Sequence, residues 1–450
     1  MSNELKPLHF DADYTMEEAL AEAKRCLNCP KPLCRMGCPI ENEIPRFIQA
    51  IAHGNFGLAN DILAERTNLP SICGRVCPRE NQCEGNCIMN KAKKPPINIG
   101  KLERFAADFE SINELRKPKK IKQDLGKVAV VGSGPAGLSV AGDIAKLGYE
   151  VTVFEGQSEP GGVLLFGIPE FRLSKSVVRR EIARLEGLGV KFVCNTFIGQ
   201  DKTLDELFAE GFDSIFIGTG THIPQEVRME NDEVHGVFQA MYLLTNVQLV
   251  ENGELDAEQI PVKKGDRVII IGGGNVAMDA ARTCVRLGCE SVTVAYRRSQ
   301  EQMPALLSEY EEARAEGVQF QWFASPVGVE GKDKVEGFKY EVMALNEDGA
   351  GIHGTGKFQV MPVDKIIIAA GHKPNARLIG EGNNLKVDEK GYIITSEDPY
   401  GMTNRDGVFA GGDVVHKPAT VVLAMREAKK AVDGMVKYME IKKAQESANQ

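Results

Sequence analysis

Short apolar runs bounded by glycine or polar residues recur along the chain and alternate with longer stretches of helical periodicity. Continuous apolar runs of this length are typical of buried parallel strands, and helical stretches between them predict crossover helices. The strand-like stretches are 127–131, 150–155, 212–220, 266–271, 291–296, 365–374 and 407–415. Helical periodicity is clearest at 16–25, 44–63, 136–147 and 420–438. The pattern predicts an α/β fold with doubly wound sheets, preceded by a helical region.

The first strand-like stretch leads directly into a Gly-x-Gly-x-x-Gly motif. Gly132 would make the tight turn, Gly134 would let the backbone approach a pyrophosphate, and Gly137 would let helix and strand pack closely. The N–H groups at the start of the next helix would bind phosphate. Glu155 ends the second strand, where an acid can accept a hydrogen bond from a ribose hydroxyl. The stretch predicts a dinucleotide site; a glycine-rich turn in an unrelated α/β unit is the alternative.

A second motif, Gly-x-Gly-x-x-Ala, contains Gly272, Gly274 and Ala277. The strand after it ends in Arg297 and Arg298, where the first unit has its glutamate. A carboxylate there would repel a 2′-phosphate, whereas two guanidinium groups can bind the phosphate in a bidentate manner. NADP(H) is therefore favoured over NAD(H). The alternative is that the arginine pair is an ordinary surface feature.

Eight of the 11 cysteines lie between Cys26 and Cys87. The first set is Cys-x2-Cys-x4-Cys-x3-Cys-Pro, and the second is Cys-x3-Cys-Pro-x4-Cys-x3-Cys. Such short gaps let three thiolates bind one cubane, and a Cys-Pro end is typical of ferredoxin runs whose last cysteine binds another cluster. The spacing predicts two [4Fe–4S] clusters. Zinc is the alternative, since paired Cys-x2-Cys units also bind zinc, but here only the first gap has two residues.

Length and charge narrow the class of protein. A chain of 450 residues predicts two to four domains, and 43% hydrophobic with 26% charged residues is an ordinary globular composition. The net charge of −9 argues against a general nucleic-acid binder or a polybasic membrane anchor. We find neither a signal-peptide pattern nor a membrane-spanning apolar run, and therefore expect a cytoplasmic protein.

The motifs also suggest domain boundaries, with a polar, basic segment separating the cysteine region from the first glycine motif. The predicted parts are a helical bis-[4Fe–4S] domain at 1–112, a linker at 113–126, an FAD-binding domain at 127–250 and 371–450, and an NADPH-binding domain at 251–370.

Taken together, these motifs resemble the small (beta) subunit of NADPH-dependent glutamate synthase and its relatives. The relatives include the N-terminal half of dihydropyrimidine dehydrogenase and the large subunit of NADH-dependent ferredoxin:NADP oxidoreductase. The resemblance runs from Cys26 to the final helix. It is carried by Cys73-Gly-Arg-Val-Cys-Pro, Pro96-Ile-Asn-Ile-Gly, Gly161-Gly-x4-Gly-Ile-Pro169, Ala295-Tyr-Arg-Arg298, Met303-Pro-Ala305 and Ala410-Gly-Gly-Asp413. It implies a helical iron–sulfur domain followed by two nested, three-layer Rossmann-like domains.

The resemblance also implies the cofactor-binding residues. The ligands of one [4Fe–4S] cluster would be Cys26, Cys29, Cys34 and Cys87. Those of the other would be Cys38, Cys77 and Cys83, with either Cys73 or Glu103 as the fourth, because one branch of relatives has Gln at the position matching Glu103. The FAD positions would be Gly132, Gly134, Pro135, Ala136, Gly137, Glu155, Gly162, Asp413 and Thr420. The NADPH positions would be Gly272, Gly274, Asn275, Ala277, Arg297 and Arg298.

The function that the resemblance implies is that of an electron-input subunit. NADPH would reduce FAD, and electrons would pass through two clusters to a larger catalytic subunit or a ferredoxin-type acceptor in a hetero-oligomer. No side chain is expected to act as acid, base or nucleophile, because the cofactors supply the chemistry. The alternatives are the flavoprotein subunit of a ferredoxin-linked transhydrogenase or electron-bifurcating complex, a dihydropyrimidine dehydrogenase subunit and, more remotely, a zinc-containing nucleotide-binding redox sensor.

The remaining cysteines are Cys194, Cys284 and Cys289. Disulfide reductases with two dinucleotide domains carry a Cys-x-x-Cys pair near the flavin, and the chain has none after Cys87. Because free cysteine is among the most buried residue types, we expect these three to be core residues.

Overall fold

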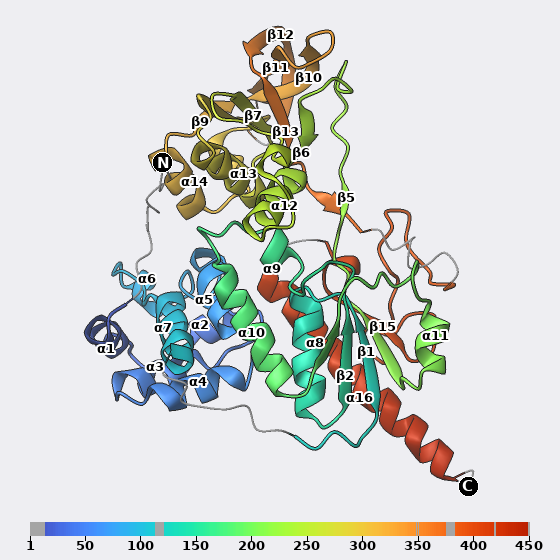
Figure 1. Ribbon diagram of the computed structural model, residues 1–450. Coiled ribbons are helices and arrows are strands. Elements are labelled where there is room, and N and C mark those ends of the chain that lie inside the picture. Colours follow the sequence, from blue (N-terminus) through green and yellow to red (C-terminus); the bar gives the residue numbers. More distant parts are fainter. Residues whose placement is uncertain are drawn as a thin grey trace. The chain divides into compact units, whose positions relative to one another are not determined.

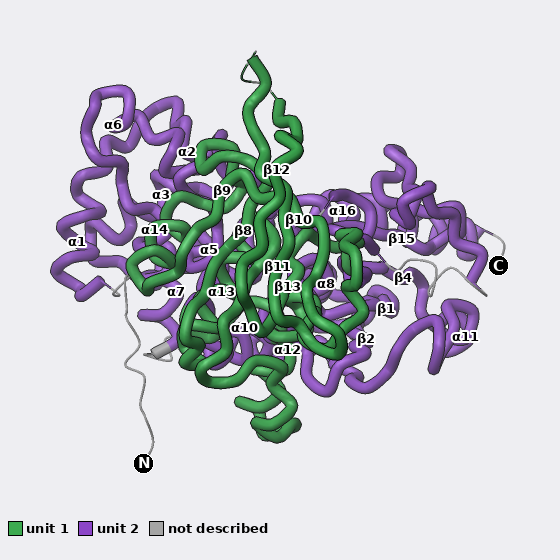
Figure 2. Tube along the Cα trace, turned by 90° about the horizontal axis from the view of Figure 1, so that it is seen from above, with its two compact units in different colours: residues 1–10, 166–171, 224–372 green, residues 11–165, 172–223, 373–450 purple. Residues whose placement is uncertain are grey.

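The computed structural model describes residues 14–112, 121–347, 349, 351–374, 383–417 and 420–448. Its elements are labelled in Figure 1. The chain divides into two compact units, shown in different colours in Figure 2. One comprises described residues 166–171 and 224–372; the other comprises the described parts of 11–165, 172–223 and 373–450. Most of the predicted linker at 113–126 lies outside the described residues.

The larger unit begins with short helices packed around a core that includes Phe47, Ile51 and Leu102. They are α1 (Met16–Lys24), α2 (Leu33–Met36), α3 (Ile44–Ala52), α4 (Phe56–Ala64), α5 (Pro70–Val76), α6 (Ile88–Lys91) and α7 (Ile99–Ile112). The single helix predicted at 44–63 is wrong. The structure has two helices there, because Gly54 adopts φ +73° and the Asn55 side chain caps α4 through the amide of Leu58.

A parallel five-stranded sheet forms the rest of this unit, in the order β15-β4-β1-β2-β3. Its strands are β1 (Lys127–Val131), β2 (Glu150–Phe154), β3 (Lys191–Val193), β4 (Ser214–Ile217) and β15 (Val408–Ala410). The helices around it are α8 (Pro135–Lys146), α9 (Val163–Phe166), α10 (Lys175–Gly187), α11 (Leu204–Ala209) and α16 (Val421–Ala448). Because β15 pairs with β4, residues after 373 complete the sheet that β1 begins.

The other unit contains a second parallel sheet, in the order β6-β13-β7-β8-β9. Its strands are β6 (Val237–Gln239), β7 (Arg267–Ile271), β8 (Ser291–Tyr296), β9 (Gln319–Trp322) and β13 (Lys365–Ile368). Its helices are α12 (Ala240–Glu251), α13 (Asn275–Arg286) and α14 (Leu307–Ala315). A three-stranded antiparallel sheet of β10 (Ala324–Glu330), β11 (Gly337–Leu345) and β12 (Ile352–Pro362) precedes β13. Two short strands, β5 (Ile223–Pro224) and β14 (His372–Lys373), lie at positions where the chain passes between units.

The predicted fold class is confirmed: a helical region is followed by two doubly wound α/β parts, one inserted into the other. The compact unit with the second sheet begins near residue 224, earlier than the predicted boundary at 251, since β6 pairs with β13. The final helix also extends to Ala448, beyond the helical periodicity predicted to residue 438, since its last residues are good helix formers. Within the described residues, no helix combines the length and the apolarity needed to cross a bilayer.

Candidate cofactor sites

Four of the cysteines line one pocket in the helical region. Cys26 and Cys29 come from the loop between α1 and α2, Cys34 lies in α2, and Cys87 is the residue before α6. Apolar side chains such as Ile48 complete the lining. Burial and, to a smaller extent, the neighbouring thiols raise the pKa of the Cys34 thiol to about 12. Four sulfur atoms thus share a confined site in which thiolates would need positive charge to be stable.

A second group brings together cysteines from both sequence sets. Burial raises the pKa of Cys38 to about 11, with further contributions from Glu103 and Cys73. The pKa of Cys77 is raised by its hydrogen bond with Cys73 and by burial. Burial also raises the pKa of Cys83, and Glu103 and Cys38 add to this effect. The last cysteine of the first set, Cys38, therefore lies with the second set.

Both candidates for the fourth ligand lie in this second group. Glu103 is 8% exposed, accepts a hydrogen bond from the Asn42 side-chain amide at 3.3 Å, and has a pKa raised to about 8 by burial. Cys73 is 2% exposed, and its Sγ lies 3.8 Å from Sδ of Met425 in α16 and 3.9 Å from Oγ1 of Thr67. Buried thiolates need a nearby positive charge, which iron would provide. Both groups of cysteines therefore fit iron–sulfur binding.

The first glycine loop has the geometry that a dinucleotide needs. Gly132 has φ +94° in the turn after β1, and a Cβ at Gly137 would lie 1.9 Å from the Gly132 carbonyl oxygen. A Cβ at Gly134 would meet no atom within 4 Å, so open space faces this backbone. Pro135 is the first residue of α8, where a missing N–H costs nothing. The loop and the helix N-terminus therefore present backbone to open space, as phosphate binding requires.

Two further loops meet the N-terminus of α8. A Cβ at Gly162 would lie 2.9 Å from Cα of Gly134, and one at Gly412 would lie 2.8 Å from Cβ of Ala136. Asp413 follows, and burial raises its pKa to about 6. The structure thus brings most of the predicted FAD positions to one end of the first sheet. The remaining one, Thr420, precedes α16, and its Oγ1 accepts a hydrogen bond from the Leu423 amide at 3.3 Å.

Ser133 is a site residue that the sequence reasoning missed. It is fully buried, and Glu155 accepts hydrogen bonds from its amide, at 3.0 Å, and from its hydroxyl. Ser133 Oγ in turn accepts a hydrogen bond from the Gly161 amide at 2.8 Å, and the Gln157 amide donates to Glu155 at 2.9 Å. The hydroxyl therefore ties three loops together. It occupies a variable position of the motif, so the spacing of the glycines carried no signal for it.

The second glycine loop is held from two sides. A Cβ at Gly272 would lie 2.5 Å from the Ala369 carbonyl oxygen, whereas a Cβ at Gly274 would meet no atom within 4 Å. The Ala305 amide donates a hydrogen bond to the Gly273 carbonyl at 2.9 Å, and the Leu306 amide donates to Asn275 Oδ1 at 3.0 Å. The segment before α14 is thus fixed beside the loop, and Ala277 is buried in the helix that follows.

Arg297 and Arg298 follow β8, which pairs with β7. Both side chains are exposed. Within the described residues neither guanidinium group forms an ion pair, although the Arg298 carbonyl accepts a hydrogen bond from the Phe323 amide at 3.2 Å. Both positive charges are therefore available to an anionic ligand.

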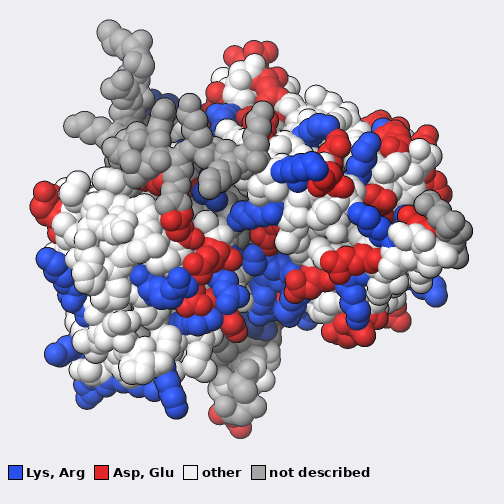
Figure 3. Space-filling view, turned by 90° about the horizontal axis from the view of Figure 1, so that it is seen from below, with Lys and Arg blue, Asp and Glu red and all other residues white. Residues whose placement is uncertain are grey.

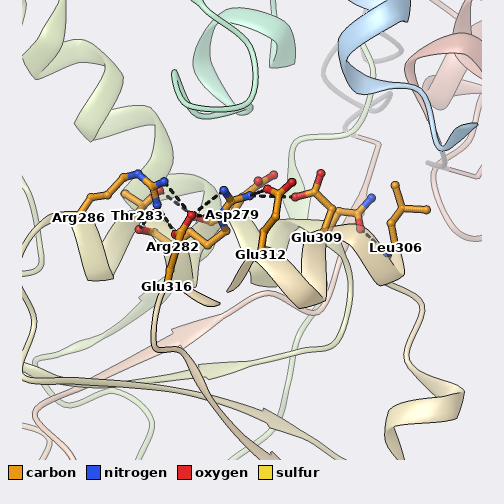
Figure 4. Close-up of polar contacts among 9 residues, drawn as sticks. Asp279, Arg282, Thr283, Arg286, Leu306, Glu309, Glu312 and Glu316 are labelled. Carbon is orange, nitrogen blue, oxygen red and sulfur yellow. Dashed lines mark hydrogen bonds and ion pairs between the residues drawn. The ribbon is translucent and has the colours of Figure 1, made fainter. Parts of the chain in front are cut away.

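A buried charge network holds α14 against α13 (Figure 4). Arg282, whose side chain is 3% exposed, pairs with Glu316, whose side chain is 2% exposed, at 2.8 Å. Arg286 also pairs with Glu316. The ring of Phe171 lies 3.8 Å from the Arg286 guanidinium and 4.5 Å from that of Arg282. The network fixes the helix that follows the segment bonded to the second glycine loop.

The surface charge is mixed. On the face shown in Figure 3, acidic and basic side chains lie next to one another across the middle and right of the view, whereas the left part is mostly uncharged with basic side chains at its edge. The charge pattern of this face agrees with the modest net charge of the chain.

Comparisons with known proteins identify the family. The model "Dihydroprymidine dehydrogenase domain II, 4Fe-4S cluster" matches residues 6–115, and the model "Pyridine nucleotide-disulphide oxidoreductase" matches residues 126–428. The glutamate synthase [NADPH] small chain of Escherichia coli (strain K12) is 37% identical over 436 residues, which cover 94% of this chain and 92% of that protein. This chain belongs to the glutamate synthase small-chain family.

A further relative agrees with this family, and a solved structure shares its fold. The NAD-dependent dihydropyrimidine dehydrogenase subunit PreT of Escherichia coli (strain K12) is 34% identical over 430 residues, covering 95% of this chain and 96% of that protein. Mycobacterium tuberculosis FprA, solved in complex with NADPH, has a TM-score of 0.58 at 20% identity and covers 72% of this chain and 86% of its own. That likeness shows the fold alone.

As a member of the glutamate synthase small-chain family, the chain is a pyridine-nucleotide-dependent flavoprotein oxidoreductase with an iron–sulfur domain, as the motifs predicted. The predicted cofactors FAD, NADPH and [4Fe–4S] agree with the family. The number of clusters, the ligands of each and the individual dinucleotide-binding residues remain predictions.

Proposed function

We propose that the chain is an electron-input subunit, in which FAD takes a hydride from NADPH and two [4Fe–4S] clusters relay the electrons to a partner subunit. The dinucleotide loops orient the two nucleotides, and the cysteines hold the clusters. Arg297 and Arg298 favour NADPH as the donor, because they offer two exposed, unpaired guanidinium groups among the described residues.

The observation that carries the proposal is the contact between Cys73 and Met425. Met425 lies five residues after Thr420 in the sequence, and its helix packs on α8 and on the segment that contains Asp413. One helix therefore contacts both the predicted FAD loops and the second cysteine group. The two predicted cofactor sites are thus connected through one helix, which supports electron transfer between FAD and a cluster bound there.

The surroundings of the two cysteine groups support a direction for this route. Two members of the second group, Cys73 and Cys83, are buried, whereas in the first group only Cys87 is. Beside the first group, Leu27 and Met36 are 63% and 76% exposed, respectively. We propose that a cluster held by the second group would lie on the flavin side of this route, and that one held by the first group, near these apolar side chains, would lie on the partner side.

The partner is proposed from the relatives, several of which are named as a small chain or a subunit. We propose a larger catalytic subunit, as in glutamate synthase, in a hetero-oligomer. Because one relative is named as a dihydropyrimidine dehydrogenase subunit, the catalytic partner in such an enzyme is the second candidate. A ferredoxin-linked transhydrogenase or electron-bifurcating complex and a cytoplasmic location remain predictions.

Anaerobic NADPH titration of the chain, followed by visible absorbance and electron paramagnetic resonance, tests the electron path. We expect NADPH to reduce the flavin and the clusters together, and both spectra to change over the same part of the titration. Cys29→Ala should lose one cluster signal and keep flavin, whereas the control Cys194→Ala should lose neither. Acid-labile sulfide near zero in anaerobically purified protein would refute the clusters. Retention of every cluster signal by Cys29→Ala would refute the ligand assignment.

The partner is tested separately, by affinity capture of the tagged chain from its own cells under anaerobic conditions. Recovery of a large, glutamine-cleaving subunit would support the glutamate synthase assignment. Recovery of a pyrimidine-reducing or ferredoxin-linked subunit would replace it and leave the proposed cofactors unchanged.

A further inference from the structure

Helix α13 ends in a Schellman motif whose two contacting positions are both cysteines. Gly288 follows the helix with φ +82°. The Gly288 amide donates to the Val285 carbonyl at 3.0 Å, and the Cys289 amide donates to the Cys284 carbonyl at 3.3 Å. In this motif, the side chain three positions before the C-cap residue contacts the side chain two positions after it. The motif therefore holds the thiols of Cys284 and Cys289 side by side.

Other helices of the chain end in the same way but with apolar residues at these two positions. The amide of Tyr149 donates to the Ile144 carbonyl after α8, that of Val190 to Leu185 after α10, and that of Val318 to Ala313 after α14. Each helix is followed by a glycine at positive φ. In these helices the two apolar side chains form a hydrophobic contact, as is usual for the motif. The pair on α13 is chemically different, because two thiols in contact can also form a bond.

The two thiols differ in access to solvent. Cys284 is fully buried in the core beneath α13, and Cys289 is partly exposed at the edge of this core, with its Sγ 3.9 Å from the Lys263 carbonyl oxygen. The pKa of Cys284 is raised, first by its hydrogen bond with Cys289 and then by burial. The expectation that Cys194, Cys284 and Cys289 are all core residues is therefore right for Cys284 only: Cys194 and Cys289 lie at partly exposed segment ends.

We propose that Cys284 and Cys289 form a reversible disulfide by exchange with a low-molecular-weight disulfide. The Cys289 thiolate attacks one sulfur of the oxidant, forms a mixed disulfide and releases one thiol. The Cys284 thiol then attacks the Cys289 sulfur, gives up its proton and releases the second thiol. Two protein thiols are oxidised and one small disulfide is reduced to two thiols, so electrons and protons balance. The product bond would join the end of α13 to the residue two before β8.

The test uses the holoprotein equilibrated anaerobically in glutathione buffers of rising oxidised fraction, then acid-quenched, alkylated and digested with trypsin. Arg286 lies between the two cysteines, so cleavage separates peptide 283–286 from peptide 287–297. We expect the disulfide-linked pair of these peptides to become their major form in oxidising buffer and to disappear after reduction. Cys289→Ala and Cys284→Ala should each abolish the pair.

Cys194 is the matched control, because it is also partly exposed and, among the described residues, has no hydrogen-bonded cysteine such as Cys284 provides for Cys289. We expect it to carry a glutathione adduct and no internal link. The proposal is overturned if Cys289 accumulates as a glutathione adduct like Cys194, or if the pair stays fully alkylated at every buffer ratio. Because these outcomes are measured on the chain without substitutions, they do not depend on how well either variant folds.

Discussion

Replacing Arg297 and Arg298 together by alanine tests the nucleotide preference. Both side chains are exposed, and within the described residues neither pairs with a carboxylate. Truncation therefore leaves no buried charge behind, and we expect the stability of the protein to change by less than about 0.5 kcal/mol. The Arg298 carbonyl keeps its hydrogen bond with the Phe323 amide in the variant, because that contact uses the backbone.

The size of the effect follows from what the two side chains would bind. A hydrogen bond to a charged group is worth about 1.5–3 kcal/mol, and exposed groups belong at the low end of this range. Losing two such bonds costs about 3 kcal/mol, which is about a 100-fold fall in kcat/KM for NADPH. NADH lacks the 2′-phosphate, so its kcat/KM should change by about twofold or less.

The assay is steady-state reduction of an artificial acceptor with each nucleotide, measured for the unaltered protein and the double variant under anaerobic conditions. Arg228→Ala is the control, because Arg228 is also an exposed arginine of the smaller compact unit. It should leave both nucleotides unaffected. Equal losses with NADPH and NADH would refute the 2′-phosphate argument, and so would full NADPH activity in the double variant.

Three further predictions concern Glu316, Lys146 and Ser133. Glu316→Gln removes a charge that Arg282 and Arg286 share, and should cost about 3 kcal/mol, seen as faster hydrogen exchange in α13 and α14, whereas the exposed Glu311→Gln should cost little. Burial lowers the pKa of Lys146 to about 8, so the charged form is penalised below that pH; Lys146→Met should raise the midpoint of thermal unfolding at pH 7, and this gain should fade as pH rises from 8 towards 10.5. A constant gain across that range would contradict the titration. Ser133→Ala should weaken FAD retention, measured as flavin released on dilution, because Glu155 loses a hydroxyl donor; unchanged retention would exclude this role.

The parallel sheets could be predicted from sequence because their strands are short apolar runs next to glycine loops. The predicted stretches at 127–131 and 291–296 coincide with β1 and β8. The antiparallel sheet of β10 to β12 went unpredicted, although β11 alternates apolar and polar residues; its partner β12 is largely exposed. The break at Gly54 was missed because the apolar periodicity continues through it.

The site, too, could be predicted in part only. Glycines and cysteines have local spacing, so the two cysteine groups and both glycine loops could be named in advance. The partners that depend on long-range contacts could not. Ser133 reaches Gly161, and Met425 reaches Cys73 from 352 positions away. The spacing of residues along the sequence cannot indicate such pairs.

The six-residue segment 166–171 belongs to the smaller compact unit although the residues on both sides of it belong to the larger one. An attempt to transplant the nucleotide-binding part by excising residues 224–372 would leave this segment behind. Arg282 and Arg286 would then lose the aromatic ring of Phe171, and Thr245 Oγ1 would lose its acceptor, the Phe166 carbonyl. Modular exchange between family members therefore has to carry both pieces of chain.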